Sequence, residues 1–388
     1  MLTSLRIRGF RSIKEQEIHL APLTVLYGPT ASGKSSVLYA PLVIRNVVAN
    51  PNQSVDNFFN LGFLNLAGFE ECVFAHDKDG EVDIRAGTDA GEYGLTLRKN
   101  SSAFYLKSSE IDLHLEVSFP YALNQTVTQM YGDGTCSIKW DGIAASVTAE
   151  TAGEAVQERA HDLAHRLNSI PEALRRVDIA PHKRGFFKPY YNPVPLSAMP
   201  VSEDEVATSI ITDPYMPAKI SADLERITGR DFRLYTPPGT AIVYLQSTDK
   251  EARLPSFLCN DGFGVNQLVY LLAKLHQPHV RTLLIEEPEA HLHPSVMRRL
   301  VRTLCAIIAD EAKQVIVTTH SEVFVSALLA RIAGKQMPVH SVRFYLVEKM
   351  DKQTVCRPQE VNEAGQITGG LASFMEDELE DIRLMLGI

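Results

Sequence analysis

The chain has 388 residues, of which 45% are hydrophobic, and its formal net charge is −9. This length predicts one large domain or two interleaved domains, and the hydrophobic content excludes global disorder. The acidic balance excludes nucleic-acid binding through overall charge, although it does not exclude a local basic groove. The five cysteines are far apart with no CxxC pair, which is typical of a reducing compartment and gives no zinc framework.

The N-terminal sequence MLTSLRIRGFRSIKEQ has charges where a signal peptide requires an apolar core. No apolar run approaches the roughly 20 residues that cross a membrane. From these features we expect a cytoplasmic protein that does not bind a membrane.

The N-terminal part of the chain divides into two regions by pattern. Residues 1–75 begin with alternating β-branched residues that predict two or three short strands. A helix is expected from Lys34, and Pro41 should kink or shorten it. Residues 76–150 alternate, as in DLHLEVSF, which predicts an antiparallel β-subdomain.

The rest of the chain predicts an insertion, a return to α/β structure and a distinct end. Residues 151–249 are expected to be helical and irregular, with one helix over 154–175. Residues 250–350 alternate between buried strands and helices. Because alternating strands and helices are expected near both ends of the chain, residues 1–75 and 250–350 should form one discontinuous core. Residues 351–388 should complete a hairpin and end in an acidic helix.

The stretch GPTASGKS matches the phosphate-binding pattern GxxxxGK[ST], between a predicted strand and a predicted helix. In such a loop, backbone N–H groups converge on phosphate oxygens and the helix N-terminus favours negative charge. Lys34 would reach the β- and γ-phosphates, and the Ser35 hydroxyl would bind Mg²⁺. The alternative is a tight glycine turn with an exposed lysine. The predicted ATP-binding residues are Gly28, Pro29, Thr30, Ala31, Ser32, Gly33, Lys34, Ser35 and Ser36.

Two strand ends carry groups suited to water attack. The buried strand LLIEE ends in Glu286, which could bind Mg²⁺, and Glu287, which could deprotonate the attacking water. The alternative is a strand that ends in two solvated acids. His320 ends the strand VIVTTH, where its imidazole could bind a γ-phosphate, although a lone histidine is more often structural.

The segment CNDGFGVNQ places two glycines at the start of an apolar helix. A helix N-terminus of this kind is a second anion site, which together with the first suggests a composite nucleotide pocket. Taken alone, a hairpin-like turn explains the segment equally well. The predicted contributing residues are Asn260, Asp261, Gly262 and Gly264.

The order GPTASGKS, NDGFGVNQ, LLIEEPEAHLHP, VTTHS resembles the ABC-type ATPase heads of the RecF, structural-maintenance-of-chromosomes (SMC) and OLD (overcoming lysogenization defect) group. The opening LRIRGFRSIKEQEIHL is similar to that of stand-alone OLD-like AAA-type ATPases that lack a TOPRIM nuclease domain. The resemblance implies an α/β P-loop NTPase fold with an antiparallel β-subdomain and an inserted helical arm region. It also implies Walker A at Gly28–Ser35, an ABC-signature equivalent at Asn260–Gly264, Walker B at Leu283–Glu286, a D-loop at Pro288–His293, catalytic Glu287 and switch His320.

The sequence departs from the family pattern at three places. Asn260 stands where the signature usually has serine, and Glu286 where Walker B usually has aspartate. The Q-loop glutamine has no clear position, Gln53 being the only nearby residue of that type. No acidic constellation of the TOPRIM nuclease kind follows the ATPase motifs, so we expect no catalysis beyond ATP hydrolysis in this chain.

The resemblance implies an Mg²⁺-dependent ATPase that ATP closes into a head-to-tail homodimer, in DNA maintenance, repair or defence against foreign DNA. The alternative is an ATP-gated switch with little turnover that controls a separate effector such as a nuclease. A transporter subunit is disfavoured by the large insertion, and a kinase by the adjacent glutamates.

Residues 175–191, RRVDIAPHKRGFFKPYY, interleave basic and aromatic residues. Such a mixture suits single-stranded nucleic acid, although ordinary interfaces have it too. One hypothesis is that Arg176, Lys183 and Arg184 line a DNA groove.

Overall fold

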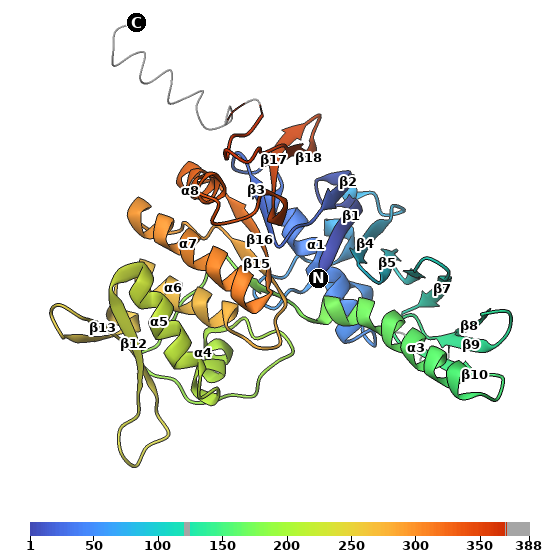
Figure 1. Ribbon diagram of the computed structural model, residues 1–388, viewed down its shortest axis with the longest axis horizontal. Helices are drawn as coiled ribbons and strands as arrows, with labels where there is room; N and C mark the ends of the chain where they lie inside the picture. The colour runs from blue at the N-terminus through green and yellow to red at the C-terminus, as the bar shows by residue number, and fades with distance from the viewer. Residues whose placement is uncertain (120–124, 369, 371–388) are drawn as a thin grey trace, which may run out of the picture. The chain divides into compact units, whose positions relative to one another are not determined.

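The computed structural model describes residues 1–119, 125–368 and 370 (Figure 1). Within this part, no helix combines the length and apolar character needed to cross a bilayer. The chain divides into two compact units that alternate along the sequence. The first unit contains residues 1–20, 35–177 and 349–355, and the second contains 21–34, 178–348 and 356–388 as far as they are described. The domain boundaries expected from the sequence stay predictions.

The first unit is built on an antiparallel six-stranded sheet of order β2-β1-β4-β5-β6-β7. The antiparallel strands expected in its second half are confirmed by their pairing, and in β7 buried residues alternate with exposed ones. The strands are β1 Leu2–Phe10, β2 Ile13–His19, β4 Val82–Thr88, β5 Gly91–Leu97, β6 Ser101–Lys107 and β7 Asp112–Ser118.

A second, three-stranded antiparallel sheet in this unit has the order β10-β9-β8 and contacts the long helix α3. The helix expected over 154–175 is confirmed, and it buries Ala160, Leu163 and Leu167. The elements are β8 Val127–Tyr131, β9 Cys136–Trp140, β10 Ala145–Ala149, α3 Glu154–Arg175, η1 Val55–Phe59, α2 Phe69–Cys72 and η2 Phe74–His76.

Helix α1, Lys34–Ala49, starts at the boundary of the two units and runs through Pro41. The expectation that Pro41 shortens this helix is therefore wrong. A proline removes one backbone donor from the helix, and buried residues on both sides of it, such as Leu38 and Leu42, favour the continued helix.

The second unit contains the central sheet, of order β11-β15-β16-β3-β17-β18. Strands β15, β16, β3 and β17 are mutually parallel, and β3, β15 and β16 are buried along their whole lengths, as expected for a sheet covered on both faces. Their carboxyl ends therefore meet at one edge of the sheet. The strands are β3 Leu23–Tyr27, β11 Val177–Ala180, β15 Thr282–Glu286, β16 Gln314–Thr319, β17 Val342–Met350 and β18 Gln353–Gln359.

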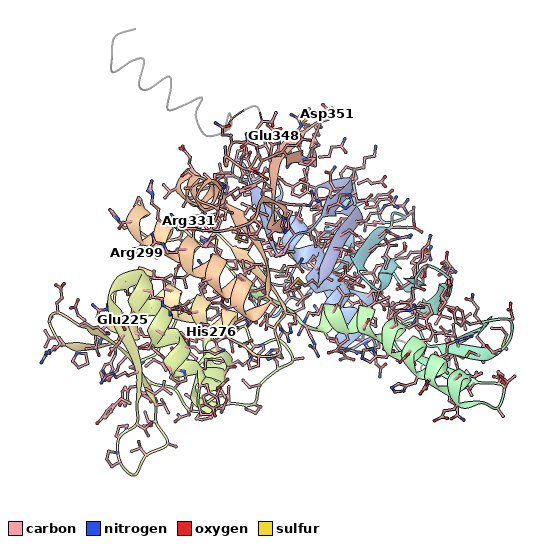
Figure 2. All side chains as sticks on the ribbon, viewed as in Figure 1. Glu225, His276, Arg299, Arg331, Glu348 and Asp351 are labelled. Atoms are coloured by element: carbon pink, nitrogen blue, oxygen red, sulfur yellow. The ribbon has the colours of Figure 1, made fainter. Side chains whose placement is uncertain are left out.

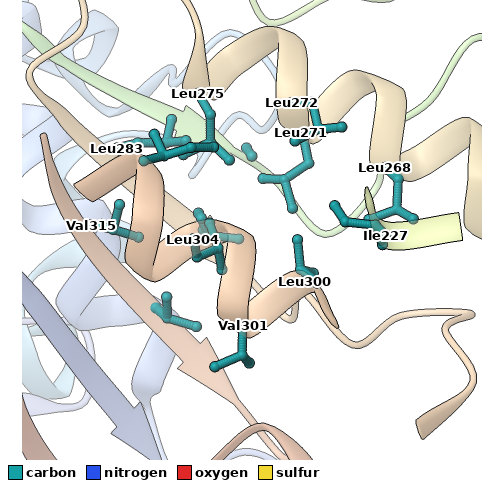
Figure 3. Packing of buried hydrophobic residues seen from close by; sticks show 14 of the residues in the cluster. Ile227, Leu268, Leu271, Leu272, Leu275, Leu283, Leu300, Val301, Leu304 and Val315 are labelled. Carbon is teal, nitrogen blue, oxygen red and sulfur yellow. The ribbon is translucent and has the colours of Figure 1, made fainter. Parts of the chain in front are cut away.

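The helices of the second unit bury one continuous apolar core. Leucines of α6 pack with Leu300 and Leu304 of α7, Ile227 of α5 and Leu283 of β15 (Figure 3). Each such side chain, once buried, contributes about 1.5–3 kcal/mol of transfer free energy. This core holds the strand ends at fixed positions. The helices are α4 Glu203–Thr212, α5 Met216–Thr228, α6 Phe263–Leu275, α7 Pro294–Glu311 and α8 Glu322–Ala333, with the turns η3 Leu258–Asn260 and η4 Val339–Ser341.

Three strands lie in the region expected to be helical and irregular. β11 joins the central sheet, while β12 Arg230–Tyr235 and β13 Tyr244–Asp249 form a small antiparallel sheet with β14 Pro255–Phe257. The alternation in RDFRLY, which buries Phe232, is the signal for β12. This alternating stretch is short and adjoins a proline-rich loop, so it is a weak signal for a strand.

The expected acidic C-terminal helix lies outside the described residues.

Candidate nucleotide site

The P-loop follows β3, and its first glycine is required by the backbone. Gly28 has φ 145°, and a Cβ atom there would lie 2.2 Å from the carbonyl oxygen of Val347 on β17. Only glycine fits both constraints. The loop therefore leaves the sheet at close range to the neighbouring strand. The remaining loop residues Pro29, Thr30, Ala31, Ser32 and Gly33 lead into α1, whose first turn contains Lys34, Ser35 and Ser36.

The Lys34 side chain lies inside the loop rather than in solvent, since the residue is 5% exposed. Its Nζ donates to the carbonyl oxygens of Gly28 at 2.9 Å and Pro29 at 2.8 Å, and lies 3.3 Å from Nδ1 of His320. Burial lowers the pKa of Lys34 to about 8, although the charge of Glu287 acts in the opposite direction. The alternative of an exposed lysine on a tight turn is therefore wrong.

Glu287 lies directly after β15 and is contacted by two histidines. Its Oε1 is 3.1 Å from Nε2 of His320, and its Oε2 is 3.0 Å from Nδ1 of His182. Its backbone has φ 45° and its N–H donates to the carbonyl oxygen of Thr318 at 2.9 Å. The carboxylate is thereby directed toward the edge where Lys34 lies.

Glu286 and Glu289 add two further carboxylates to this edge. Glu286 is 5% exposed, and its Oε2 accepts a hydrogen bond from the backbone N–H of His182 at 3.2 Å. Oε1 of Glu289 accepts from the Thr319 hydroxyl at 2.8 Å and from the N–H of His320 at 2.6 Å, while its buried Oε2 has no hydrogen-bond partner among the described residues. Carboxylate oxygens are among the ligands that Mg²⁺ prefers, so Glu286 fits this ion chemically.

Arg184 fixes the backbone at the end of β15 through hydrogen bonds to carbonyl oxygens. It is 3% exposed and donates to the carbonyl oxygens of Pro181 at 2.9 Å, Glu286 at 2.6 Å and Glu287 at 2.9 Å. Burial lowers its pKa to about 10, so it stays charged at neutral pH. The expectation that Arg184 lines a DNA groove is wrong, because a buried guanidinium bound to carbonyl groups cannot reach phosphates.

The rest of the basic and aromatic stretch is also largely engaged. In the first unit, Arg176 pairs with Glu172 at 3.2 Å. In the second, Lys188 pairs with Asp204 at 2.5 Å, and Phe186 and Tyr191 are buried. A sequence pattern of basic and aromatic residues does not show whether these side chains are packed in the protein or form an exposed binding surface. Of the three residues of the hypothesis, Lys183 alone is exposed with no ion-pair partner among the described residues.

The second glycine segment forms the start of α6. The helix is capped by Gly262, whereas Asn260 ends the preceding turn η3. Asp261 accepts from the Ser247 hydroxyl and lies 3.3 Å from Nη2 of Arg230. A Cβ on Gly264 would come 2.8 Å from the carbonyl oxygen of His291, so this glycine permits packing against the expected D-loop, while a Cβ on Gly262 would meet nothing within 4 Å.

His182 is the residue that sequence analysis missed. It comes after Pro181, which follows the short buried strand β11, whereas His320 comes directly after the buried strand β16. The same signal, a histidine after a buried strand, was present at both places. What the sequence did not contain was the pairing of β11 with β15, two strands about a hundred residues apart along the chain.

Comparisons with known proteins fit this geometry. A protein-family model described as "AAA domain, putative AbiEii toxin, Type IV TA system" matches residues 144–326, and one described as "AAA domain" matches residues 4–114. Both models describe AAA domains, so the chain is similar to AAA-type ATPases over these two stretches. It is also similar to the OLD nuclease of Thermus scotoductus, which is 24% identical over 344 residues that cover 84% of this chain and 60% of that relative. The chain thus spans 60% of the length of the curated relative it matches.

Two solved structures were compared with the fold. The SMC head domain from Thermotoga maritima is 12% identical, covers 93% of this chain and 99% of its own, and has a TM-score of 0.44. The Smc head domain from Pyrococcus furiosus, solved with an extended coiled coil and bound to the C-terminal domain of ScpA, is 11% identical, covers 98% of this chain and 99% of its own, and has a TM-score of 0.50. This second likeness and the parallel central sheet confirm the expected α/β P-loop fold.

Proposed function

We propose that this ATPase hydrolyses ATP with Mg²⁺ at the carboxyl edge of the central sheet, with Glu287 as the general base. One observation carries the proposal: Lys34, His320 and Glu287 form a continuous chain of contacts, 3.3 Å and 3.1 Å long. Transfer of a phosphoryl group to water requires a cation for the phosphates and a base for the water. Here the cation, Lys34, and the base, Glu287, are linked through His320.

Each residue of the site has its own proposed role in ATP binding and hydrolysis. The N–H groups of the loop Gly28–Lys34 hold the phosphates, and Lys34 exchanges the two loop carbonyls for phosphate oxygens. Ser35 and Glu286 would each offer an oxygen ligand to Mg²⁺, which would neutralise phosphate charge. Glu287 takes a proton from water as the water oxygen bonds to the γ-phosphorus and the bond to the β-phosphate oxygen breaks. His320 donates a hydrogen bond to the γ-phosphate.

We further propose that ATP closes two copies of the chain head to tail, so that the start of α6 in one copy faces the P-loop of the other. Gly262 supports this idea. Its φ is −62° and a Cβ would meet nothing within 4 Å, so the described part of the chain does not require glycine at this position. Close approach of another molecule would require it. Two-fold symmetry then gives two sites, and ATP stabilises the closed state by its contacts to both copies.

The pathway we propose is DNA maintenance, repair or defence against foreign DNA in the cytoplasm, supported by the OLD nuclease and Smc likenesses. The second candidate is an ATP-gated switch with little turnover that controls a separate effector. The family description that names a type IV toxin–antitoxin system favours an ATPase acting through another component. ATPase rates with and without DNA separate the two roles.

The site is tested by binding and hydrolysis. Lys34→Ala removes the charge that neutralises the phosphates, so titration with a fluorescent ATP analogue should show at least about a hundredfold loss of affinity. Chelation of Mg²⁺ should abolish hydrolysis by the wild-type protein. Normal ATP affinity of Lys34→Ala would contradict the site.

The dimer is tested by light scattering. Glu287→Gln retains the shape of the side chain but loses the base, so its mass should double with ATP and Mg²⁺. Gly262→Asp adds bulk and negative charge where the partner's phosphates approach, and should stay monomeric while binding ATP. A Glu287→Gln mass that does not respond to ATP would contradict the dimer.

A further inference from the structure

His182 contacts both carboxylates at the end of the Walker B strand. Its backbone N–H donates to Oε2 of Glu286 at 3.2 Å, and its Nδ1 lies 3.0 Å from Oε2 of Glu287. It follows β11, the strand that pairs with β15 on the side away from β16. The base is therefore flanked by one histidine from each neighbouring strand.

We propose that His182 is a positioning residue that holds Oε2 of Glu287 while His320 releases Oε1 to accept the proton of the attacking water. The inference rests on the proposed function, in which Glu287 is the base. It assigns His182 a role that neither the P-loop nor His320 can fill, because both must turn toward the phosphates.

The directions of the hydrogen bonds support this division. The Lys34 ammonium can only donate, so Nδ1 of His320 accepts and its Nε2–H donates to Oε1 of Glu287. Nδ1–H of His182 donates to Oε2. Without nucleotide, each carboxylate oxygen of Glu287 thus has its own imidazole donor.

Nucleotide binding changes only one side of this arrangement. When Lys34 and His320 turn to phosphate oxygens, Oε1 loses its donor and becomes available to water. Oε2 keeps the bond to His182, which prevents rotation of the carboxylate about its broad terminal torsion. A base held within a few tenths of an ångström transfers a proton efficiently, and a loose one does not.

The fold does not need the imidazole of His182. Its side chain is 59% exposed and that of Glu287 is 34% exposed, and exposed ion pairs contribute little to stability. The backbone of Glu286 and Glu287 is already fixed by Arg184 at 2.6 Å and 2.9 Å. The position of the ring is thus explained by the carboxylate that it orients.

In the reaction, the water oxygen bonds to the γ-phosphorus and its proton passes to Oε1 of Glu287. The electron pair of the broken bond stays on the β-phosphate oxygen of ADP. His182 neither gains nor loses a proton, so its effect is on the rate constant of the chemical step and not on ATP affinity.

Three variants test the inference. His182→Asn places an amide nitrogen at the position of Nδ1 and keeps the donor, whereas His182→Gln places it one bond farther out and His182→Ala removes it. All three keep the backbone bond to Glu286. We expect kcat to fall about 10- to 100-fold in His182→Ala and His182→Gln and less than about fivefold in His182→Asn, with the Kd of a fluorescent ATP analogue within about twofold of wild type.

The control is His340→Ala, which removes an exposed histidine of η4 and should leave kcat unchanged. A double variant with Glu287→Gln adds a second test, because removing His182 should cost nothing once the base is gone. The inference is overturned if His182→Ala keeps the wild-type kcat, if His182→Asn is no better than His182→Ala, or if affinity falls as much as rate. Wild-type protein without Mg²⁺-dependent turnover, or Glu287→Gln with wild-type turnover, would instead overturn the proposed function and the inference with it.

Discussion

Two clusters of histidine and carboxylate side chains in the second unit have opposite arrangements. In the site, one carboxylate, Glu287, lies between two imidazoles, and these side chains are 30–59% exposed. At the ends of α6 and α7, one imidazole, His276 (Figure 2), lies between two carboxylates: Nε2 is 2.7 Å from Oδ2 of Asp223 and Nδ1 is 3.1 Å from Oε1 of Glu311. The side chains of His276 and Asp223 are 4% and 6% exposed.

The difference in exposure separates a structural cluster from a functional one. Buried charges cannot exchange their partners for water, so removing one leaves the others uncompensated. Lys313 strengthens the buried cluster, since it donates to the carbonyl oxygens of Leu275 and Gln277 at the end of α6 and lies 3.4 Å from Glu311. The exposed cluster can replace its contacts with substrate at small cost, as catalysis requires.

The largest effect on stability should come from His276→Ala. It leaves Asp223 buried without its imidazole, which should lower the free energy of unfolding by about 3–5 kcal/mol, measured by urea denaturation. His340→Ala, an exposed histidine in η4 of the same unit, is the control and should change it by less than about 0.5 kcal/mol. Equal values for the two variants would erase the distinction between the clusters.

Arg184→Lys should have an intermediate effect on both stability and turnover. Lysine keeps the charge but cannot span the carbonyl groups of Pro181, Glu286 and Glu287 as the guanidinium does. We expect a loss of about 2–3 kcal/mol in unfolding free energy and a reduced kcat, because the backbone that carries Glu287 is no longer fixed. Unchanged urea midpoint and kcat would show that the buried arginine does not position the strand end.

The smallest effects distinguish the two glycines of α6. Gly264→Ala places a Cβ 2.8 Å from the carbonyl oxygen of His291 and should cost about 1–2 kcal/mol of stability. Gly262→Ala meets open space, so its stability should change by less than about 0.5 kcal/mol, while ATP-dependent dimerisation weakens. Urea denaturation and light scattering read the two effects separately. If Gly262→Ala destabilises the monomer more than Gly264→Ala, the division of roles is wrong.

The strands, loop and helix that carry the predicted site residues are local elements that the sequence predicts. The P-loop is a continuous stretch whose strand, loop and helix follow one another, so its pattern carries its own structural context. The strand-end positions of Glu287 and His320 follow from short apolar runs, which indicate buried parallel strands. These elements are each defined by fewer than about ten neighbouring residues.

The parts that failed depend on partners far along the chain. His182 meets Glu287 only because β11 pairs with β15, and no local pattern encodes this pairing. The sequence around Arg184 does not indicate whether its side chain is buried or exposed. Only the packed structure shows that it is buried.

Single-turnover hydrolysis of ATP by wild-type and Glu287→Gln protein tests the central claim most directly. Both proteins should bind ATP and Mg²⁺ with similar affinity, because the side chain keeps its shape and the P-loop is unchanged. The rate of phosphate release should fall about 10²- to 10⁴-fold in Glu287→Gln, which is the contribution expected of a general base. A rate within about threefold of wild type would show that Glu287 does not activate the water and would contradict the account.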